Sequence, residues 1–390
     1  LSANEGMKTG SRGLRGTLSE GMANQITGAL NEEEQQLVKF HGSYMQDDRD
    51  RREERERKKL EWAYSYMIRL RLPGGDLTAD QWLKLQESCD RNASGTIKIT
   101  TRQTIQFHGI VKARMKPTMK DFDVLGLDSI AACGDVNRNV MAGAYPDLIP
   151  YHAEVFEFAD KISEHLLPKT GAYKEVWLDG EKLPEDQPAE ADPLYLDHYL
   201  PRKFKIAIAI PPHNENDVFA NDIGLIAIGE GEHFEGFNIS IGGGLGATHG
   251  NQATYPRRGD IIGFVPKDQT LDVCWNIVAI QRDYGNREDR KLSRLKYTVD
   301  RLGLEWFREE IERRCGFELQ KARPYEFTYR GDPFGWIKDH HNEWAYGIFV
   351  ENGLVRDHND YNIKSALIEA AKTEKCGIRF TGNQNVMLTH

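Results

Sequence analysis

The residues best suited to chemistry in this sequence lie in IKITTRQTIQFHG, residues 97–109. Successive side chains of a β-strand point to opposite faces, so a strand here has one apolar face and one face of polar and cationic groups. The polar face carries Lys98, Thr100, Arg102, Thr104, Gln106 and His108. A turn at residues 101–103 would divide the strand in two, and the sequence leaves this alternative open.

Cationic side chains recur in three further segments. They are Arg69 with Arg71 in SYMIRLRLPGG, Arg138 in GDVNRNVM, and Lys203 with Lys205 in PRKFKIAIAIPP. A charge that is buried without a partner is very costly, and a solvent-facing sheet would explain any one of these segments. Taken together they favour a bound polyanion, since sites lined by cationic donors suit carboxylates, phosphates or sulfur oxyanions.

A glycine-rich loop, GGGLG, supplies Gly242, Gly243 and Gly244. Such a loop allows close backbone approach and N–H donation to an anion or a flat ligand. It is not a P-loop, because no G-K-[ST] follows, and no G-x-G-x-x-G opens a helix there. Among the histidines, His108 could be a general acid, an anion donor or a core residue, and we assign His41 a structural role.

The composition limits the class of protein. The chain has 390 residues and a formal net charge of −9, which suggests two or three domains and argues weakly against a nucleic-acid partner. It has no run of about 18 apolar residues and no signal peptide, so we expect no membrane partner and a cytoplasmic location. Its five cysteines are far apart and show no C-x-x-C spacing, so no metal site is predicted from them.

The elements that position these groups alternate between helix and strand. Residues 1 to about 45 read as an extended polar arm with a short helix at 32–40, followed by a charged, solvated helix at 46–61. Strands are predicted at 65–72, 97–109, 201–212 and 236–241, and helices at 78–89, 152–167 and 270–285. An exposed acidic loop is predicted at 186–193.

The same order of elements returns after about residue 320. A strand in WAYGIFVENG and a helix in NIKSALIEAAKTEK precede IRFTGNQNVMLTH, residues 378–390. This last stretch aligns with residues 97–109 without a gap, so that Arg379 falls on Lys98 and Gln384 on Gln103. An internal repeat indicates a duplicated supersecondary unit.

Several of these motifs resemble the sulfite and nitrite reductase haemoprotein family. They are IKITTRQTIQFHG, GDVNRNV, LPRKFK, GFNISIGGGL and GNREDRKLSRLKY. LRGTLSE and FHGSYMQDDRDRREERERKKLE are similar, more narrowly, to the haemoprotein (beta) subunits of assimilatory NADPH-sulfite reductases.

The resemblance implies an α+β fold with duplicated ferredoxin-like half-domains, the second one incomplete, around a mixed α/β middle domain that binds sirohaem. Four parts are then expected. They are an extended N-terminal arm and charged helix at 1–60, the first half-domain at 61–139, the middle sirohaem and substrate domain at 140–320, and a truncated second half-domain at 321–390.

The family reaction implied by the resemblance is the six-electron reduction of sulfite to sulfide in sulfur assimilation. It takes place at a sirohaem coupled to a [4Fe–4S] cluster, with electrons from an NADPH-oxidising flavoprotein (alpha) subunit. By motif, the substrate-binding catalytic cations are Arg69, Arg138, Lys203 and Lys205. The implied cofactor-binding residues are Lys98, Thr100, Arg102, Gln106, His108, Gly242, Gly243 and Gly244. Lys98 stands where an arginine is more usual.

The chain departs from the family pattern in its cysteines. The family holds its cluster by C-x5-C and C-x3-C, and none of the five cysteines has that setting, so we expect the cluster ligands beyond residue 390. The chain is therefore expected to be the N-terminal portion of a longer protein and inactive by itself. Two alternatives stay open: nitrite reduction within the same family, and a truncated, non-catalytic module for anion binding or assembly.

Overall fold

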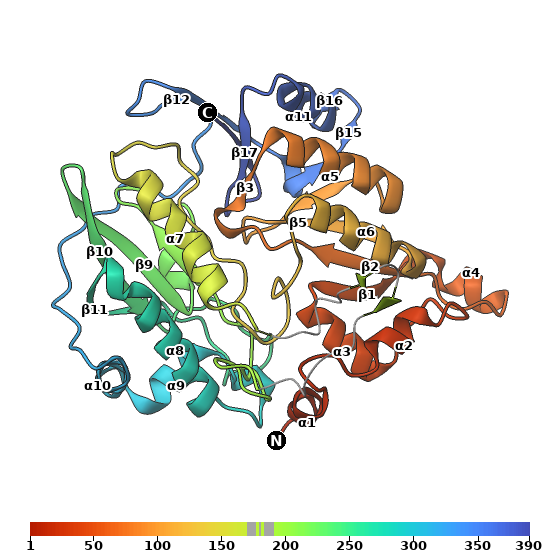
Figure 1. Cartoon of the computed structure of the whole chain (residues 1–390), viewed down its shortest axis with the longest axis horizontal. Coiled ribbons are helices and arrows are strands. Elements are labelled where there is room, and N and C mark those ends of the chain that lie inside the picture. Colours follow the sequence, from red (N-terminus) through yellow and green to blue (C-terminus); the bar gives the residue numbers. More distant parts are fainter. Residues whose placement is uncertain (170–176, 179–180, 183–190) are drawn as a thin grey trace.

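Two five-stranded sheets and one four-stranded sheet carry the described part of the chain (Figure 1). The computed structural model describes residues 1–169, 177–178, 181–182 and 191–390. Most of the acidic loop predicted at 186–193 lies outside these residues. No helix of the described part is long and apolar enough to cross a membrane.

The first half-domain is an antiparallel sheet covered by two helices. Its strands are β1 (Ser43–Asp47), β2 (Tyr64–Arg69), β4 (Ile97–Ile99) and β5 (Ile105–Ile110), and its helices are α5 (Ala79–Asn92) and α6 (Lys112–Val124). As predicted, α5 begins after Thr78, whose side chain accepts from the Gln81 N–H while the Gln81 side chain bonds back. This reciprocal cap satisfies two donors that the helix start leaves free.

The second half-domain repeats this arrangement, which confirms the duplication. Its elements are β12 (Gly335–Lys338), β13 (Trp344–Ile348), β17 (Gly377–Phe380), β18 (Val386–Thr389) and helix α11 (Ile363–Lys372). Each half also lends a two-residue strand to the other: β3 (Asp76–Leu77) pairs with β17, and β14 (Leu354–Val355) pairs with β4. The two halves are thus joined through their backbones. A small ribbon of β15 (Asp357–His358) and β16 (Tyr361–Asn362) lies beside α11.

The middle of the chain folds around a mixed sheet in the order β11-β10-β9-β8. Its strands are β8 (Ile206–Ala209), β9 (Ile223–Glu230), β10 (His233–Ile241) and β11 (Asp260–Pro266). Helices α7 (His152–His165), α8 (Thr270–Tyr284), α9 (Leu295–Leu302) and α10 (Leu304–Cys315) pack beside it (Figure 1). Two short strands, β6 (Trp177–Leu178) and β7 (Glu181–Lys182), pair with each other. The sequence predicted α7, α8 and β10 at these places.

The N-terminal segment is not the extended arm that the sequence suggested. Only the short helix predicted near 32–40 and a charged helix were expected, and the segment folds into four helices. They are α1 (Ala3–Gly10), α2 (Leu18–Ala23), α3 (Glu32–Phe40) and α4 (Arg52–Arg57). Leu14 and Leu37 are fully buried. The first helices are too short for a clear apolar period, so their burial against the rest of the chain could not be read from the pattern.

Two predicted strands differ from the structure. Residues 97–109 form a hairpin and not one strand, because the chain turns at residues 101–103, as in the alternative that the sequence left open. In this turn Gln103 adopts a left-handed backbone conformation with φ +51°. The strand predicted at 201–212 begins only at Ile206, and all four of its residues are buried. Lys203 and Lys205 therefore lie in the irregular segment before β8 and not on a face of the strand. The domain boundaries stay a prediction.

Candidate functional site

A group of cations converges where the first half-domain meets the middle sheet. We call it the cation cluster, and it consists of Arg69, Arg102, Arg138, Lys203, Lys205 and Arg294. Phe204 N–H donates to Val136 O at 3.0 Å and Arg138 N–H donates to Phe204 O at 2.9 Å. These bonds place the GDVNRNV loop beside the lysine-bearing segment. The fold therefore brings together cationic residues that are far apart in the sequence, as the sequence analysis predicted.

One buried carboxylate, Asp222, organises the centre of the cation cluster. Its Oδ2 accepts from the Lys205 backbone N–H at 2.8 Å. Arg294 donates to both oxygens of the same carboxylate, from Nε at 3.1 Å and from a terminal nitrogen at 2.8 Å. The side chain of Asp222 is fully buried. Because Arg294 already binds it in this bidentate way, little of its charge is left for the neighbouring lysines.

The two lysines have shifted pKa values. Burial is the main cause that lowers the pKa of Lys205 to about 7, the charges of Arg102, Arg294 and Lys203 lower it further, and Asp222 opposes them. Burial and the charges of Arg138, Arg294 and Arg202 lower the pKa of Lys203 to about 8. Two half-buried amines that titrate near neutral pH can hold an anion and also give up a proton.

Their ammonium groups also lack protein acceptors. Within the described residues, neither Lys203 Nζ nor Lys205 Nζ donates a hydrogen bond or forms an ion pair. By contrast, Lys296 Nζ donates to three backbone carbonyls, those of Gly244, Gly246 and Tyr255. Buried polar groups of a protein are nearly always hydrogen-bonded. The free donors of Lys203 and Lys205 therefore point to an anionic ligand.

Arg69 and Arg138 meet at the backbone of Ala132. Both guanidinium groups lie within hydrogen-bonding distance of Ala132 O, at 3.4 and 3.3 Å. Arg69 also lies 3.0 Å from Cys133 Sγ. Tyr44 lies beside the same groups: burial raises the pKa of its hydroxyl, the nearby Cys133 thiol raises it further, and Arg138 and Arg69 oppose this.

Arg102, in the turn of the first hairpin, reaches across to the middle domain. Its guanidinium donates to Asn139 O at 3.0 Å and to Asn221 Oδ1 at 2.6 Å, and it also bonds to Ile206 O. Burial is the main cause that lowers the pKa of Arg102, and no carboxylate in the described part of the chain binds the guanidinium directly. Arg102 therefore fixes the hairpin to the strand that follows Lys205 and adds a positive charge there.

The other predicted residues of this hairpin have several roles. With the Gln106 amide oriented to suit its neighbours, its oxygen accepts from Arg69 Nε at 2.9 Å and its nitrogen donates to His108 at 3.1 Å. Lys98 lies across from Gln106 in the sheet, and its Nζ has one long contact, 3.4 Å to Asn352 O. Burial, followed by the charges of Lys98 and Arg69, lowers the pKa of His108. The Thr100 hydroxyl accepts from the Arg102 N–H at 3.1 Å and so closes the turn.

The glycine loop differs from the prediction in one respect. The N–H groups of Gly242, Gly243 and Gly244 donate to the carbonyls of Asp222, Asn221 and Arg257, at 2.9, 2.9 and 2.8 Å. These donors are therefore used within the protein, and the prediction of N–H donation to an anion is wrong. Close backbone approach is real: a side chain at Gly243 would meet Phe219 O and Asn221 O.

Several residues of the site were not singled out from the sequence. They are Tyr44, Cys133, Arg202, Asp222 and Arg294. Arg294 lies in GNREDRKLSRLKY, so a signal for it was present. Asp222 looks like an ordinary acidic residue before a strand, and nothing in the sequence pairs it with Arg294.

Comparison with known proteins places these residues in a family context. Residues 157–319 match the family model described as the nitrite and sulphite reductase 4Fe-4S domain, and residues 61–124 match the nitrite/sulfite reductase ferredoxin-like half domain. The sulfite reductase (NADPH) hemoprotein beta-component of Leptospira biflexa is 57% identical over 385 residues, which are 99% of this chain and 69% of that protein. The protein of the same name from Staphylococcus saprophyticus is 52% identical over 99% of this chain and 68% of its own length.

The fold has a counterpart among solved structures. The structure of the Mycobacterium tuberculosis NirA protein matches 100% of this chain and 66% of that chain, with a TM-score of 0.76 and 24% sequence identity. At this identity the match supports the fold alone. The chain spans about two thirds of the length of the relatives that it matches, and the prediction that it is inactive by itself finds no support in these matches.

Proposed function

Because the chain belongs to the nitrite and sulfite reductase family, we propose that it supplies the substrate-binding cations and part of the sirohaem site for the reduction of sulfite to sulfide. The observation that carries this proposal is the pair of ammonium groups, on Lys203 and Lys205, that have no protein acceptor among the described residues. The names of the relatives favour sulfite over nitrite as the substrate.

The cation cluster fits sirohaem, an iron tetrapyrrole that carries eight carboxylates. The cations of the cluster outnumber its carboxylates, since Asp222 is already bound by Arg294. Lys98, on the first hairpin, adds an ammonium group with only one weak protein contact. Sirohaem, when bound, supplies the iron that takes the oxyanion and delivers electrons to it.

The [4Fe–4S] cluster of the family finds no ligands in the described part of the chain. Cys89, Cys133 and Cys274 are buried, Cys315 and Cys376 are half-buried, and no group of three or more His, Cys, Asp or Glu side chains there could hold a metal ion. We infer that electrons come from an NADPH-oxidising alpha component, as the beta-component name of the relatives suggests.

The residues of this chain divide the work between them. Arg69 and Arg138 hold the negative oxygens of the substrate, because a guanidinium group offers several N–H donors in a planar fork. Lys205 and Lys203 give protons to the oxygens that leave as water, since their pKa values lie near neutral pH. An anion bound beside Lys205 raises its pKa again, so the lysine takes up a proton when the substrate binds.

This proton uptake offers a direct test. Free Lys205 is largely neutral above a pH of about 7, so sulfite binding at about pH 8 should take up a proton and the affinity should fall as the pH rises further. Titration calorimetry of the chain with sulfite, in buffers of different ionisation enthalpy, measures the uptake. In Lys205→Met the uptake should fall substantially and the affinity should drop about tenfold.

A Lys291→Met variant is the control, because Lys291 is an exposed lysine outside the cation cluster. Sulfite binding by Lys205→Met with the affinity and proton uptake of the wild type would contradict the assigned role. A wild type that does not bind sulfite would contradict the role proposed for the two ammonium groups.

A further inference from the structure

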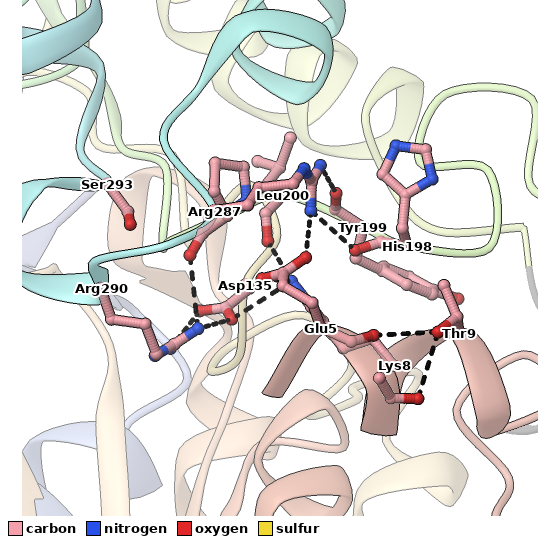
Figure 2. A network of polar contacts seen from close by, with 12 residues as sticks. Glu5, Lys8, Thr9, Asp135, His198, Tyr199, Leu200, Arg287, Arg290 and Ser293 are labelled. Carbon is pink, nitrogen blue, oxygen red and sulfur yellow. Dashed lines mark hydrogen bonds and ion pairs between the residues drawn. The ribbon is translucent and has the colours of Figure 1, made fainter. Parts of the chain in front are cut away.

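The N-terminal helix α1 inserts a charged side chain into the interior of the protein (Figure 2). The Lys8 side chain has no exposed surface, and its Nζ lies 2.7 Å from Glu5 Oε1 and 3.8 Å from Asp135 Oδ2. It also donates to Leu200 O at 2.7 Å. Leu200 belongs to the middle of the chain, so a helix that reads as part of a polar arm is fixed to the segment that leads to Lys203.

The segment before Lys203 is held by cations. Four consecutive carbonyls, those of His198, Tyr199, Leu200 and Pro201, accept hydrogen bonds from Arg287, Lys8 and Arg290. Arg287 donates to the first two at 3.3 and 2.6 Å, Lys8 to the third at 2.7 Å, and Arg290 to the fourth at 3.3 Å. Buried carbonyls need donors. This segment is neither helix nor strand, and the three cations supply them.

Two carboxylates hold the three cations in place. Glu5 bonds to both Lys8 and Arg287, and Asp135 accepts from Arg290 through both oxygens, at 2.7 and 3.0 Å. Each carboxylate is almost completely buried. Charge-assisted bonds of this kind are short and directional, so the group fixes the positions of the carbonyls that it binds.

The same group is linked to both chain segments that carry the substrate cations. Asp135 precedes Arg138 in GDVNRNV, and its carbonyl accepts from the Leu200 N–H at 3.0 Å. The four carbonyls directly precede the residues 202–205, which include Lys203 and Lys205. A displacement of Lys8 would therefore act on the lysines and on the arginine together.

We propose that Lys8 is a positioning residue of the anion site, which acts by fixing the backbone that presents Lys203, Lys205 and Arg138. This inference rests on the proposed function, because it takes the anion at the cation cluster as the ligand. Lys8 does not touch that ligand. Its effect comes from geometry, since small displacements of a binding group cost much of its interaction with a substrate.

The alternative is that Lys8 only stabilises the fold, and Lys112 provides a matched control. Lys112 is also a buried lysine whose Nζ donates to three loop carbonyls, those of Gly21, Asn24 and Ala29, at 3.1, 3.2 and 2.6 Å. None of these carbonyls leads to a residue of the cation cluster. Lys8→Met and Lys112→Met thus remove the same chemistry from two different places, and both keep the apolar stem of the lysine.

The test compares sulfite binding by the two variants and the wild-type chain, by titration calorimetry at several pH values and with melting temperatures in parallel. Lys8→Met should lower the affinity about tenfold. It should also move the pH midpoint of binding upward, because Lys205 would move away from Arg102, Arg294 and Lys203 and into water. Lys112→Met should lower the melting temperature while affinity and midpoint stay as in the wild type.

Three outcomes would overturn the proposal. One is a Lys8→Met variant with unchanged affinity and pH midpoint, and another is an equal change in Lys112→Met. If Lys8→Met does not fold, Glu5→Gln replaces it, because this variant keeps the Lys8 bond to Leu200. Glu5→Gln should lower the affinity for sulfite about threefold. An unchanged affinity in Glu5→Gln is the third outcome that would overturn the proposal. If the wild type binds sulfite and one of these outcomes occurs, only this inference is wrong. If the wild type does not bind sulfite, the proposed function is wrong as well.

Discussion

Each half-domain contains a corresponding hairpin, β4–β5 in the first and β17–β18 in the second. The two hairpins have a similar backbone conformation in their turns, but their side chains differ in charge. In both turns a threonine hydroxyl, on Thr100 or Thr381, accepts from the N–H two residues on. In both, a glutamine adopts a left-handed conformation, with φ +51° at Gln103 and +69° at Gln384. Each glutamine donates to the other hairpin, Gln103 to Phe380 O and Gln384 to Ile99 O.

The side chains at the tips of the turns differ. Arg102 extends from the first turn to Asn139, Asn221 and Ile206 and adds a charge to the cation cluster. Asn383, its equivalent, is exposed and donates to Asp332 at 2.7 Å. Duplication has therefore kept the turn and its exchange of glutamines, while the first turn, and not the second, adds a cation to the cation cluster.

The sheets around the hairpins differ in the same direction. Helix α6 packs on β2 in the first half-domain, where Ile68 is 1% exposed. In the second half-domain Trp344 on β13 is 53% exposed.

The largest difference should come from the turn tips. In Arg102→Ala we expect the affinity for sirohaem to fall about a hundredfold, because a charge and the bonds to Asn139, Asn221 and Ile206 are lost. Asn383→Ala should change it by less than about twofold, since that side chain is exposed and uncharged. Absorbance titration of the purified chain with sirohaem measures both. The Arg102→Lys variant keeps the positive charge but loses the forked guanidinium group. An equal loss of sirohaem affinity in Arg102→Ala and Asn383→Ala would show that the two turn tips are equivalent.

Much of the comparison could be predicted from the sequence, because it depends on local patterns. The repeat was visible in the alternation of apolar residues and in matched glutamines, and Arg69, Arg138, Lys203 and Lys205 were grouped by motif. What a lysine bonds to could not be predicted. Lys8 and Lys205 both occur in short polar stretches, and only the fold shows that Lys8 meets a carbonyl at residue 200 while Lys205 meets none within the described residues.

The glutamine exchange should show a smaller asymmetry. Gln103 makes three buried bonds, to the N–H and the carbonyl of Ala142 and to Phe380 O, whereas Gln384 makes one, to Ile99 O. Each buried group left unpaired costs about 1–3 kcal/mol, so Gln103→Ala should lower the free energy of unfolding by about 3 kcal/mol and Gln384→Ala by about 1 kcal/mol. Urea unfolding of both variants measures this. A larger loss in Gln384→Ala would show that the second half depends more on the exchange.

The smallest expected effect concerns the residues opposite each other in the exchanged strands. Arg379 faces Asp76 of β3 and binds its carboxylate from two nitrogens, at 2.9 and 3.2 Å, and it also stacks over Phe156. Lys98, at the equivalent place, faces Leu354 of β14 and so has no carboxylate there. The charge of Arg379 is paired with a carboxylate within the protein, while Lys98 has one long contact, 3.4 Å from its Nζ to Asn352 O.

Arg379→Ala should therefore lower the free energy of unfolding by about 2 kcal/mol, through lost packing and an unpaired Asp76. Lys98→Ala should change stability by less than about 0.5 kcal/mol, and it should lower the affinity for sirohaem about threefold, because one charge available to its carboxylates is removed. Urea unfolding and sirohaem titration of both variants separate the two effects. A stability loss in Lys98→Ala as large as that in Arg379→Ala would show that Lys98 also stabilises the fold. The two halves would then differ in charge only at the tips of their turns.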